Sequence, residues 1–313
     1  NVHLQTTAGN SARVMIRGAH THVVYHEING HVKLDSRAQH HNEERGDDDG
    51  VYKTMLKKTK FPDFLQWVKE MDEQDRAFIQ HGVDMNLKIA KAGKDLEKVG
   101  HYVSNLLEKG YLVDDVFTAS KILTASATDA RMAGLNYPVM ASGGSGNQGI
   151  VAILVPYTVG HYYKIPQPVI LQSIGLSHLI NSYIKCYTGD LSVLCGCAVA
   201  AGAGAAVAIV FQQYPDDVEK MTLALNTVLS DLGGMLCDGA KAGCALKVAS
   251  STDSAIRAAY MALNGHGITH TEGFVGRSLE ETVMHLGQIC HDGMSHVDET
   301  MLDIMLDKTL PES

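Results

Sequence analysis

The chain has 313 residues, of which 45% are hydrophobic and 19% charged, and its net charge is −9. This composition is typical of a globular protein with a sizeable core and excludes wholesale disorder. The acidic balance argues against nucleic-acid binding, because an acidic surface repels a phosphate backbone. Six cysteines are too few for a secreted disulfide scaffold, so we expect a cytoplasmic protein with reduced thiols.

The first part of the chain carries β-strand signals. Residues 12–34 alternate between apolar and polar side chains, and Asn29-Gly30 separates two of these runs. This dipeptide predicts a hairpin with a tight turn. Residues 35–50 are polar and end in an acidic run, so we expect a surface loop there. Residue 1 is Asn, not Met, which indicates a processed, trimmed or partial chain.

The pattern changes to helical spacing from Phe61, and Pro62 stands where a first helical turn tolerates it. Beyond residue 129 the chain is rich in Ala, Gly, Met and Leu, which predicts long buried helices. We therefore predict an α+β fold with two parts: a small β-containing region at 1–57 and a large, mainly α-helical domain at 58–313. Earlier helices within that domain are expected at about 75–92, 95–109 and 113–123.

One uncharged run, residues 191–211, is just long enough to span a bilayer. Much of it is Ala and Gly, which are weakly apolar, and no basic flank follows it. We therefore favour a helix buried in a protein core over a membrane span, and expect no membrane association. Small residues let helices approach closely, which leaves a homo-oligomer open.

A glycine loop at Ser142–Gly149 precedes a long apolar run. Four glycines in eight residues allow the backbone to approach a ligand and expose its N–H groups. Followed by a helix, such a loop can bind a carboxylate or phosphate, although it lacks the Gly-Lys-Ser/Thr ending of a P-loop. The side chains of Ser145, Asn147 and Gln148 can bond a carboxylate or an amine. A plain turn between helices is the alternative.

Two further pairs are candidates for ligand binding or proton transfer. Asp129 and Arg131 lie just before the glycine loop, where they either form a local ion pair or leave Arg131 to clamp a carboxylate. His20 and Thr21 stand at the head of a predicted strand, where they can bind a carboxylate or shuttle a proton. A surface histidine is the alternative for the second pair.

Three cysteines form the candidate metal site. Cys195 lies in the uncharged run, and Cys237 and Cys244 lie in the segment GGMLCDGAKAGCALKV. No zinc-type spacing is present. On a straight helix Cys237 and Cys244 would stand about 10.5 Å apart, too far to bind one small cluster. They act together only if the helix breaks between them, which Gly239 and Gly243 favour. Buried thiols without a ligand are the alternative.

The segments SATDARMAG, SGGSGNQGI, LSVLC and GGMLCDGAKAGCALKV resemble the L-cysteine desulfidase family, which is related to the alpha domain of iron–sulfur L-serine dehydratases. The likeness runs from about residue 12 to residue 305. It implies a [4Fe–4S] cluster on Cys195, Cys237 and Cys244, whereas Cys197 has no counterpart in the family pattern. Such a cluster is sensitive to oxygen.

The resemblance also bears on the N-terminal part. The family's Gly-Gly-His-Thr matches residues 18–21, with Ala19 in place of the second Gly, and this implies a catalytic role for His20 and Thr21. The desulfidases carry an N-terminal Cys-Thr-Glu-Pro motif that is absent here. Its place would be before residue 1.

The activity implied by the resemblance is a β-elimination from a small amino acid. L-Cysteine would give pyruvate, ammonia and sulfide, and L-serine would give pyruvate and ammonia. An iron without a protein ligand would act as a Lewis acid on the substrate. A family member that binds a small amino acid without turnover is the alternative. The expected substrate-binding residues are Ser142, Ser145, Gly146, Asn147, Gln148 and Arg131.

Overall fold

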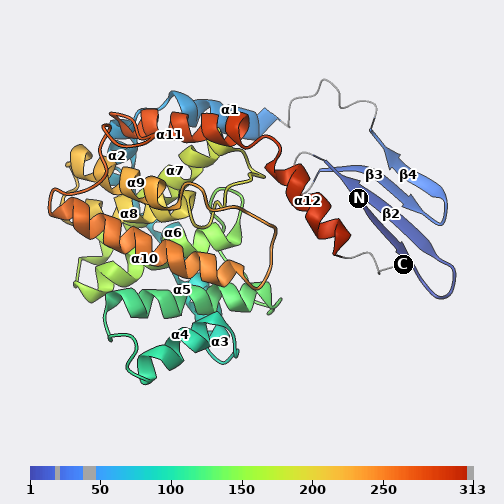
Figure 1. Cartoon of the computed structure of the whole chain (residues 1–313), viewed down its shortest axis with the longest axis horizontal. Coiled ribbons are helices and arrows are strands. Elements are labelled where there is room, and N and C mark those ends of the chain that lie inside the picture. The colour runs from blue at the N-terminus through green and yellow to red at the C-terminus, as the bar shows by residue number, and fades with distance from the viewer. Residues whose placement is uncertain (18–21, 38–46, 309–313) are drawn as a thin grey trace. The chain divides into compact units, whose positions relative to one another are not determined.

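The computed structural model describes residues 1–17, 22–37 and 47–308. Two compact units, Asn1–Lys58 and Thr59–Ser313, make up the chain. The first contains a four-stranded antiparallel sheet and the second is helical, which confirms the predicted α+β class (Figure 1). No helix among the described residues is both long enough and apolar enough to cross a membrane.

The sheet of the first unit has its strands in chain order, β1-β2-β3-β4. The turn between β3 and β4 has Asn29 at φ 49° and Gly30 at φ 77°. Positive φ at both central residues is what a tight hairpin turn needs, so the predicted hairpin is confirmed. The first strand was not predicted, because four residues are too few to reveal alternation. The strands are β1 (Val2–Gln5), β2 (Ser11–Ile16), β3 (Val23–Ile28) and β4 (His31–Asp35).

The expected loop over residues 35–50 is wrong at its C-terminal end. Helix α1 spans Asp47–Lys58 and so begins within the acidic run. The residues that follow this run include Lys, Met and Leu, which favour helix strongly enough to extend it backward into the charged segment.

The second unit consists of helices joined by short connections. The helix expected at 75–92 is present as α3, and the one at 95–109 as α4, whereas α5 runs well beyond the 113–123 expected. The helices are α2 (Phe61–Lys69), α3 (Glu73–Gly93), α4 (Val99–Glu108), α5 (Val116–Met132), α6 (Gly146–Tyr162), α7 (Gln167–Thr188), α8 (Ala200–Gln213), α9 (Val218–Leu232), α10 (Cys244–Leu263), α11 (Leu279–Gln288) and α12 (Val297–Asp307), with a π-helical turn at Ile289–Gly293.

Helix α8 is the central helix of this unit. It packs against α6, α7, α9 and α10, and every residue from Ala200 to Gln212 is buried. A Cβ atom at Gly204 would lie 2.5 Å from the carbonyl oxygen of Ser177, so only glycine permits this approach of α7 and α8. The expectation of one buried helix over 191–211 is therefore only half right. The helix begins at Ala200, and the residues before it form turns.

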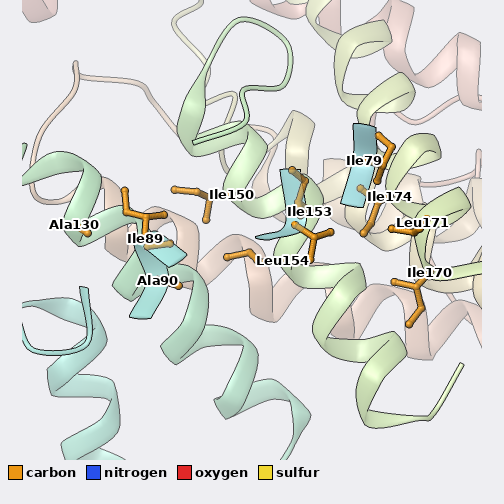
Figure 2. Close-up of a cluster of buried hydrophobic side chains, with 12 residues drawn as sticks. Ile79, Ile89, Ala90, Ala130, Ile150, Ile153, Leu154, Ile170, Leu171 and Ile174 are labelled. Carbon is orange, nitrogen blue, oxygen red and sulfur yellow. The ribbon is translucent and has the colours of Figure 1, made fainter. Parts of the chain in front are cut away.

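A cluster of branched aliphatic side chains joins α3, α5, α6 and α7 (Figure 2). Ile89, Ile150, Ile153 and Ile174 are completely buried in it. Full burial of each such side chain contributes about 1.5–3 kcal/mol. This packing fixes the start of α6 relative to α7, and the candidate site lies where those two helices meet the cysteine segments.

Candidate functional site

The glycine loop is a tight turn that leads directly into α6. Ser142 and Ser145 exchange both backbone hydrogen bonds, at 3.1 and 3.0 Å, and between them Gly143 and Gly144 have φ of 52° and 82°. Positive φ at both central residues is typical of the two-residue turn found in β-hairpins. Glycine is favoured at both positions because it adopts positive φ without steric cost. The sequence therefore specifies this turn locally.

The N-terminus of α6 is left open by the turn. Ser145 occupies the N-cap position, but its side chain accepts no capping hydrogen bond. Among the described residues, no hydrogen bond reaches the backbone N–H groups of Gly146, Asn147 or Gln148. Unpaired N–H groups at a helix N-terminus attract anions, since the helix dipole adds to their partial charge. The loop can thus accept a carboxylate.

Arg131 lies against this loop. Its Nη1 donates to Asn147 Oδ1 at 3.1 Å, and a Cβ atom at Gly146 would lie 2.4 Å from its Nε. Asp129 points elsewhere and accepts the N–H of Gly100 at 2.8 Å. Asp129 and Arg131, both among the described residues, therefore do not form the local ion pair that was one of the two alternatives. Arg131 supports the loop through Asn147.

Helix α7 supplies three polar residues that the sequence analysis missed. His178 Nδ1 and Asn181 Nδ2 each lie 2.8 Å from Ser142 Oγ, and Lys185 follows one turn later. Burial lowers the pKa of His178 to about 4, so the imidazole is neutral at neutral pH. The available signal was the spacing of three and four residues, which places polar side chains on one face of an otherwise apolar helix.

Several buried polar atoms around the loop have no partner. The described residues contain seven buried side-chain N or O atoms without a hydrogen bond, and three of them are Gln148 Oε1, His178 Nε2 and Asn181 Oδ1. Native proteins almost always satisfy such atoms with protein groups, water or a ligand. These three atoms mark a candidate binding position beside the glycine loop. The other four atoms are in Ser120, Ser126 and Asp129 of α5 and Ser177 of α7.

The side chain of Gln148 joins the glycine loop to the turn that carries Cys195. A Cβ atom at Gly143 would lie 2.9 Å from Gln148 Oε1, and one at Gly196 would lie 2.7 Å from Gln148 Nε2. The glutamine therefore lies between the two glycines. Both must be glycine for this packing, which brings the turn around Cys195 against the glycine loop.

Backbone pairing brings Cys195 next to Cys237. The Cys195 N–H donates to the carbonyl of Met235 at 2.8 Å, and the Cys237 N–H donates to the carbonyl of Val193 at 2.7 Å. These bonds flank an isolated antiparallel bridge. The two cysteines therefore stand on the same face of the bridge as diagonal neighbours, whose Cα atoms are about 7–8 Å apart in such pairs.

The chain breaks between Cys237 and Cys244, as the sequence analysis required for both to act together. Helix α9 ends at Leu232, α10 begins at Cys244, and Gly239 between them has φ 91°. The Cys244 sulfur accepts the N–H of Lys241 at 3.4 Å.

The thiols share one electrostatic environment. A hydrogen bond from the Cys197 thiol, then one from the backbone N–H of Ala198 and then the charge of Lys247, lower the pKa of Cys195 to about 6. The same hydrogen bond raises the pKa of Cys197 well above its usual value, and burial and the charges of Cys195, Cys244 and Cys237 act in the same direction. Sulfurs from three separate segments are therefore close enough to influence one another.

The donor chemistry fits an iron–sulfur cluster. No three His, Cys, Asp or Glu side chains in the described part of the chain are grouped so as to hold a metal ion. A four-iron cluster binds its cysteines one to an iron, so its ligands surround it and do not meet at one ion. Soft thiolates are the ligands that such clusters take. Cys195, Cys237 and Cys244 are thus suitable in type and neighbourhood.

His20 and Thr21 fall outside the described residues, and their catalytic role stays a prediction. A cavity of about 730 Å³ lies among α2, α9 and α11, and none of the expected site residues lines it.

Comparison with known proteins adds the family context. A family model described as serine dehydratase alpha chain matches residues 8–303. A UPF0597 protein of Geobacter sulfurreducens is 57% identical over 307 residues, which are 98% of this chain and 71% of the relative. A UPF0597 protein of Elusimicrobium minutum is 50% identical, with 96% and 69% covered, and one of Desulfotalea psychrophila is 38% identical, with 95% and 69% covered. No solved structure matches the chain.

Proposed function

This chain belongs to the serine dehydratase alpha chain family, and we propose that it is a lyase that uses a [4Fe–4S] cluster to remove the β-substituent of L-cysteine or L-serine. The family relationship supports a lyase-type enzyme. The cluster, the substrate and the residue roles given below are parts of the proposal.

One observation carries the proposal. The segments of Cys195 and Cys237 are paired through their backbones, and Gln148 packs against Gly196 beside the first of them. A set of thiols therefore adjoins a glycine loop whose buried polar atoms lack partners. A metal-dependent lyase needs this juxtaposition, because the substrate must be bound next to the group that assists departure of its β-substituent.

Cys195, Cys237 and Cys244 would hold the cluster. When bound, the cluster supplies an iron that has no protein ligand, and such an iron is a Lewis acid. Lys247 Nζ donates to the carbonyl of Leu236 at 2.7 Å and to Asp238 at 2.5 Å, which braces the segment around Cys237. Its positive charge also favours the thiolate form of Cys195, the form that binds iron.

The chain's other groups would bind and orient the substrate. The open N–H groups at the start of α6 would accept a carboxylate, and Arg131 would fix Asn147 in place by its hydrogen bond. Elimination removes the α-proton and the β-substituent, and the aminoacrylate product takes up water to give pyruvate and ammonia. From L-cysteine the third product is hydrogen sulfide, and from L-serine it is water.

The test is an anaerobic preparation assayed for both substrates. We expect a brown protein with bound iron and inorganic sulfide, pyruvate formation from L-cysteine or L-serine, and sulfide release from L-cysteine. A colourless preparation that binds no iron after anaerobic reconstitution would refute the cluster. An iron-loaded protein that forms no pyruvate from either substrate would favour a member that binds without turnover.

Single Cys→Ser variants locate the ligands. Cys195→Ser, Cys237→Ser and Cys244→Ser should each lose most of the iron, because a hydroxyl is a poor ligand for iron in these clusters. Cys186→Ser is the matched control, because Cys186 lies within α7 and is not one of the three proposed ligands. Iron loss in Cys186→Ser equal to that in Cys195→Ser would contradict the assignment.

A further inference from the structure

Helix α7 presents a row of polar groups toward the glycine loop. Asn181 is completely buried and Lys185 is 5% exposed, although both lie in a helix whose other buried residues are largely apolar. Burying an amide and an ammonium is costly unless each finds a partner. The partners that the described residues supply are incomplete, so the row is a candidate for ligand recognition.

Two carbonyl oxygens in this region need a hydrogen-bond donor. Asn181 uses its Nδ2 to bond Ser142 Oγ, and its Oδ1 has no partner among the described residues. Gln148 is 4% exposed, and its Oε1 is likewise without a partner. An ammonium group has three donors and no acceptor, so it matches two converging carbonyl oxygens.

The third group is the side chain of Lys185, a cationic donor. None of the ion pairs formed by the described residues includes Lys185. Burial lowers the pKa of Lys185, and the charges of Asp190, Cys197, Cys290 and Cys237 oppose that effect. The ammonium is therefore on the side of the thiols, in a low-dielectric environment where an added carboxylate would bind strongly.

The side chains of these three residues meet at Gly143. A Cβ atom built there would lie 2.8 Å from Asn181 Nδ2, 2.9 Å from Gln148 Oε1 and 3.0 Å from Lys185 Cγ. The amine nitrogen and the carboxyl carbon of an α-amino acid are both bonded to one carbon. Recognition groups for the two must therefore lie close together, and the three side chains that carry them all reach the space around Gly143.

We propose that Gln148 Oε1 and Asn181 Oδ1 bind the α-ammonium group of the substrate and that Lys185, together with the open N–H groups at the start of α6, binds its carboxylate. This proposal rests on the proposed function, since it names the residues that recognise that enzyme's substrate. The three are positioning residues that select a zwitterionic α-amino acid. Because Gln148 also packs on Gly196, the bound amino acid lies beside the turn of Cys195, with its β-substituent available to the cluster.

The experiment measures binding of a ligand that is not turned over. L-Alanine has both recognised groups but no β-leaving group, propionate lacks the ammonium, and ethylamine lacks the carboxylate. Dissociation constants are measured by calorimetry on the anaerobically reconstituted protein at pH 7. We expect L-alanine to bind at least about tenfold more tightly than either analogue, because a polar site rejects a ligand that leaves its groups unpaired.

Each variant should lose one kind of discrimination. In Asn181→Leu and Gln148→Leu the preference for L-alanine over propionate should fall at least about fivefold, while in Lys185→Met the preference for L-alanine over ethylamine should fall at least about tenfold. Lys185→Arg should retain part of the preference for L-alanine over ethylamine. This result would show that the loss in Lys185→Met does not come from a folding defect. Lys121→Met is the matched control, because Lys121 is paired with Asp253 at 3.1 Å and should keep both preferences.

The outcomes separate this proposal from the lyase proposal. Variants that keep both preferences of the wild-type protein, while iron content and absorbance stay normal, would overturn the recognition proposal alone. A protein that holds no iron but loses the two preferences as described would support recognition and overturn the lyase. Equal binding of L-alanine, propionate and ethylamine by the wild-type protein would overturn recognition by these residues.

Discussion

Two completely buried asparagines hold the glycine loop from different helices, and the protein completes the bonding of only one. Asn86 of α3 donates to the carbonyl of Gly149 at 3.2 Å and accepts the N–H of Met140 at 3.0 Å. Asn181 of α7 donates to Ser142 Oγ at 2.8 Å and accepts nothing from the described residues. We name these regions the Asn86 seam (Asn86, Met140, Gly149) and the Asn181 seam (Ser142, His178, Asn181).

The difference separates a side of the loop whose hydrogen bonds are complete from a side where acceptors stay unpaired among the described residues. Leaving a buried polar atom unpaired costs about 1–3 kcal/mol, so a fold keeps such an atom only where something else satisfies it. At the Asn86 seam the loop is fixed by bonds to its own backbone. At the Asn181 seam the same loop is left with unsatisfied acceptors. The four predictions that follow test this contrast, from the largest expected effect to the smallest.

The largest effect is expected at the completed seam. Asn86→Leu keeps the volume of the side chain but leaves the carbonyl of Gly149 and the N–H of Met140 without partners. Two orphaned backbone groups should lower the free energy of unfolding by about 4 kcal/mol. Urea denaturation measures this value. A loss below about 1 kcal/mol would mean that the seam is not fixed by these bonds.

The next effect is a pH dependence at His178. Burial holds its pKa at about 4 in the folded protein, below the ordinary value near 6.5. Between these values the unfolded chain binds a proton that the folded protein does not, so stability falls as the pH decreases from 6.5 to 4. The loss should be about 3 kcal/mol. Urea denaturation at several pH values compares the wild-type protein with His178→Asn.

The His178→Asn variant can keep a bond to Ser142 Oγ but cannot titrate, so it serves as the control. Between pH 6.5 and 4 the wild-type protein should therefore lose about 3 kcal/mol more of its free energy of unfolding than this variant does. Parallel pH profiles for the two proteins would show that the imidazole is not held neutral at the Asn181 seam.

A smaller effect separates the two glycines of the turn. Gly143→Ala and Gly144→Ala should each cost about 1–2 kcal/mol, because both φ values are positive. An added methyl group at Gly144 meets no atom within 4 Å, whereas at Gly143 it meets Asn181 and Gln148. Only Gly143→Ala should therefore also weaken L-alanine binding, as measured by calorimetry. Equal weakening in both variants would attribute the effect to the backbone alone.

The smallest change in stability is expected at the incomplete seam. Asn181→Leu removes one hydrogen bond to Ser142 Oγ, but Ser142 keeps its hydrogen bond with His178. The substitution also removes the unpaired Oδ1 of Asn181. The free energy of unfolding should change by less than about 1 kcal/mol. A loss as large as that in Asn86→Leu would show that the two seams do not differ, and would weaken the recognition proposal.

Much of the fold was readable from the sequence because its signals are local. The hairpin at Asn29-Gly30 and the helices α3 and α4 follow from turn chemistry and from the spacing of apolar residues. Boundaries were less readable. Helix α8 begins at Ala200 and not near residue 191, because the preceding segment forms backbone bonds with residues 235–237. No local pattern reveals a pairing over some forty positions.

The candidate site divides in the same way. The glycine loop, Arg131 and the break between Cys237 and Cys244 were anticipated, since glycines and charged residues in an apolar region are visible in any sequence. His178, Asn181 and Lys185 were missed, because on the sequence they are isolated polar residues within a long helix.

The sequence by itself determined the class of fold, the turn before α6, and, through resemblance, the family. Only the tertiary structure decided which polar groups meet at the loop, because that depends on how α6, α7 and the turn around Cys195 pack together. Gly143 and Gly196 permit this packing because both leave room for the side chain of Gln148. That shared contact is evident only in three dimensions. Propensities are local, whereas a binding site is made of long-range contacts.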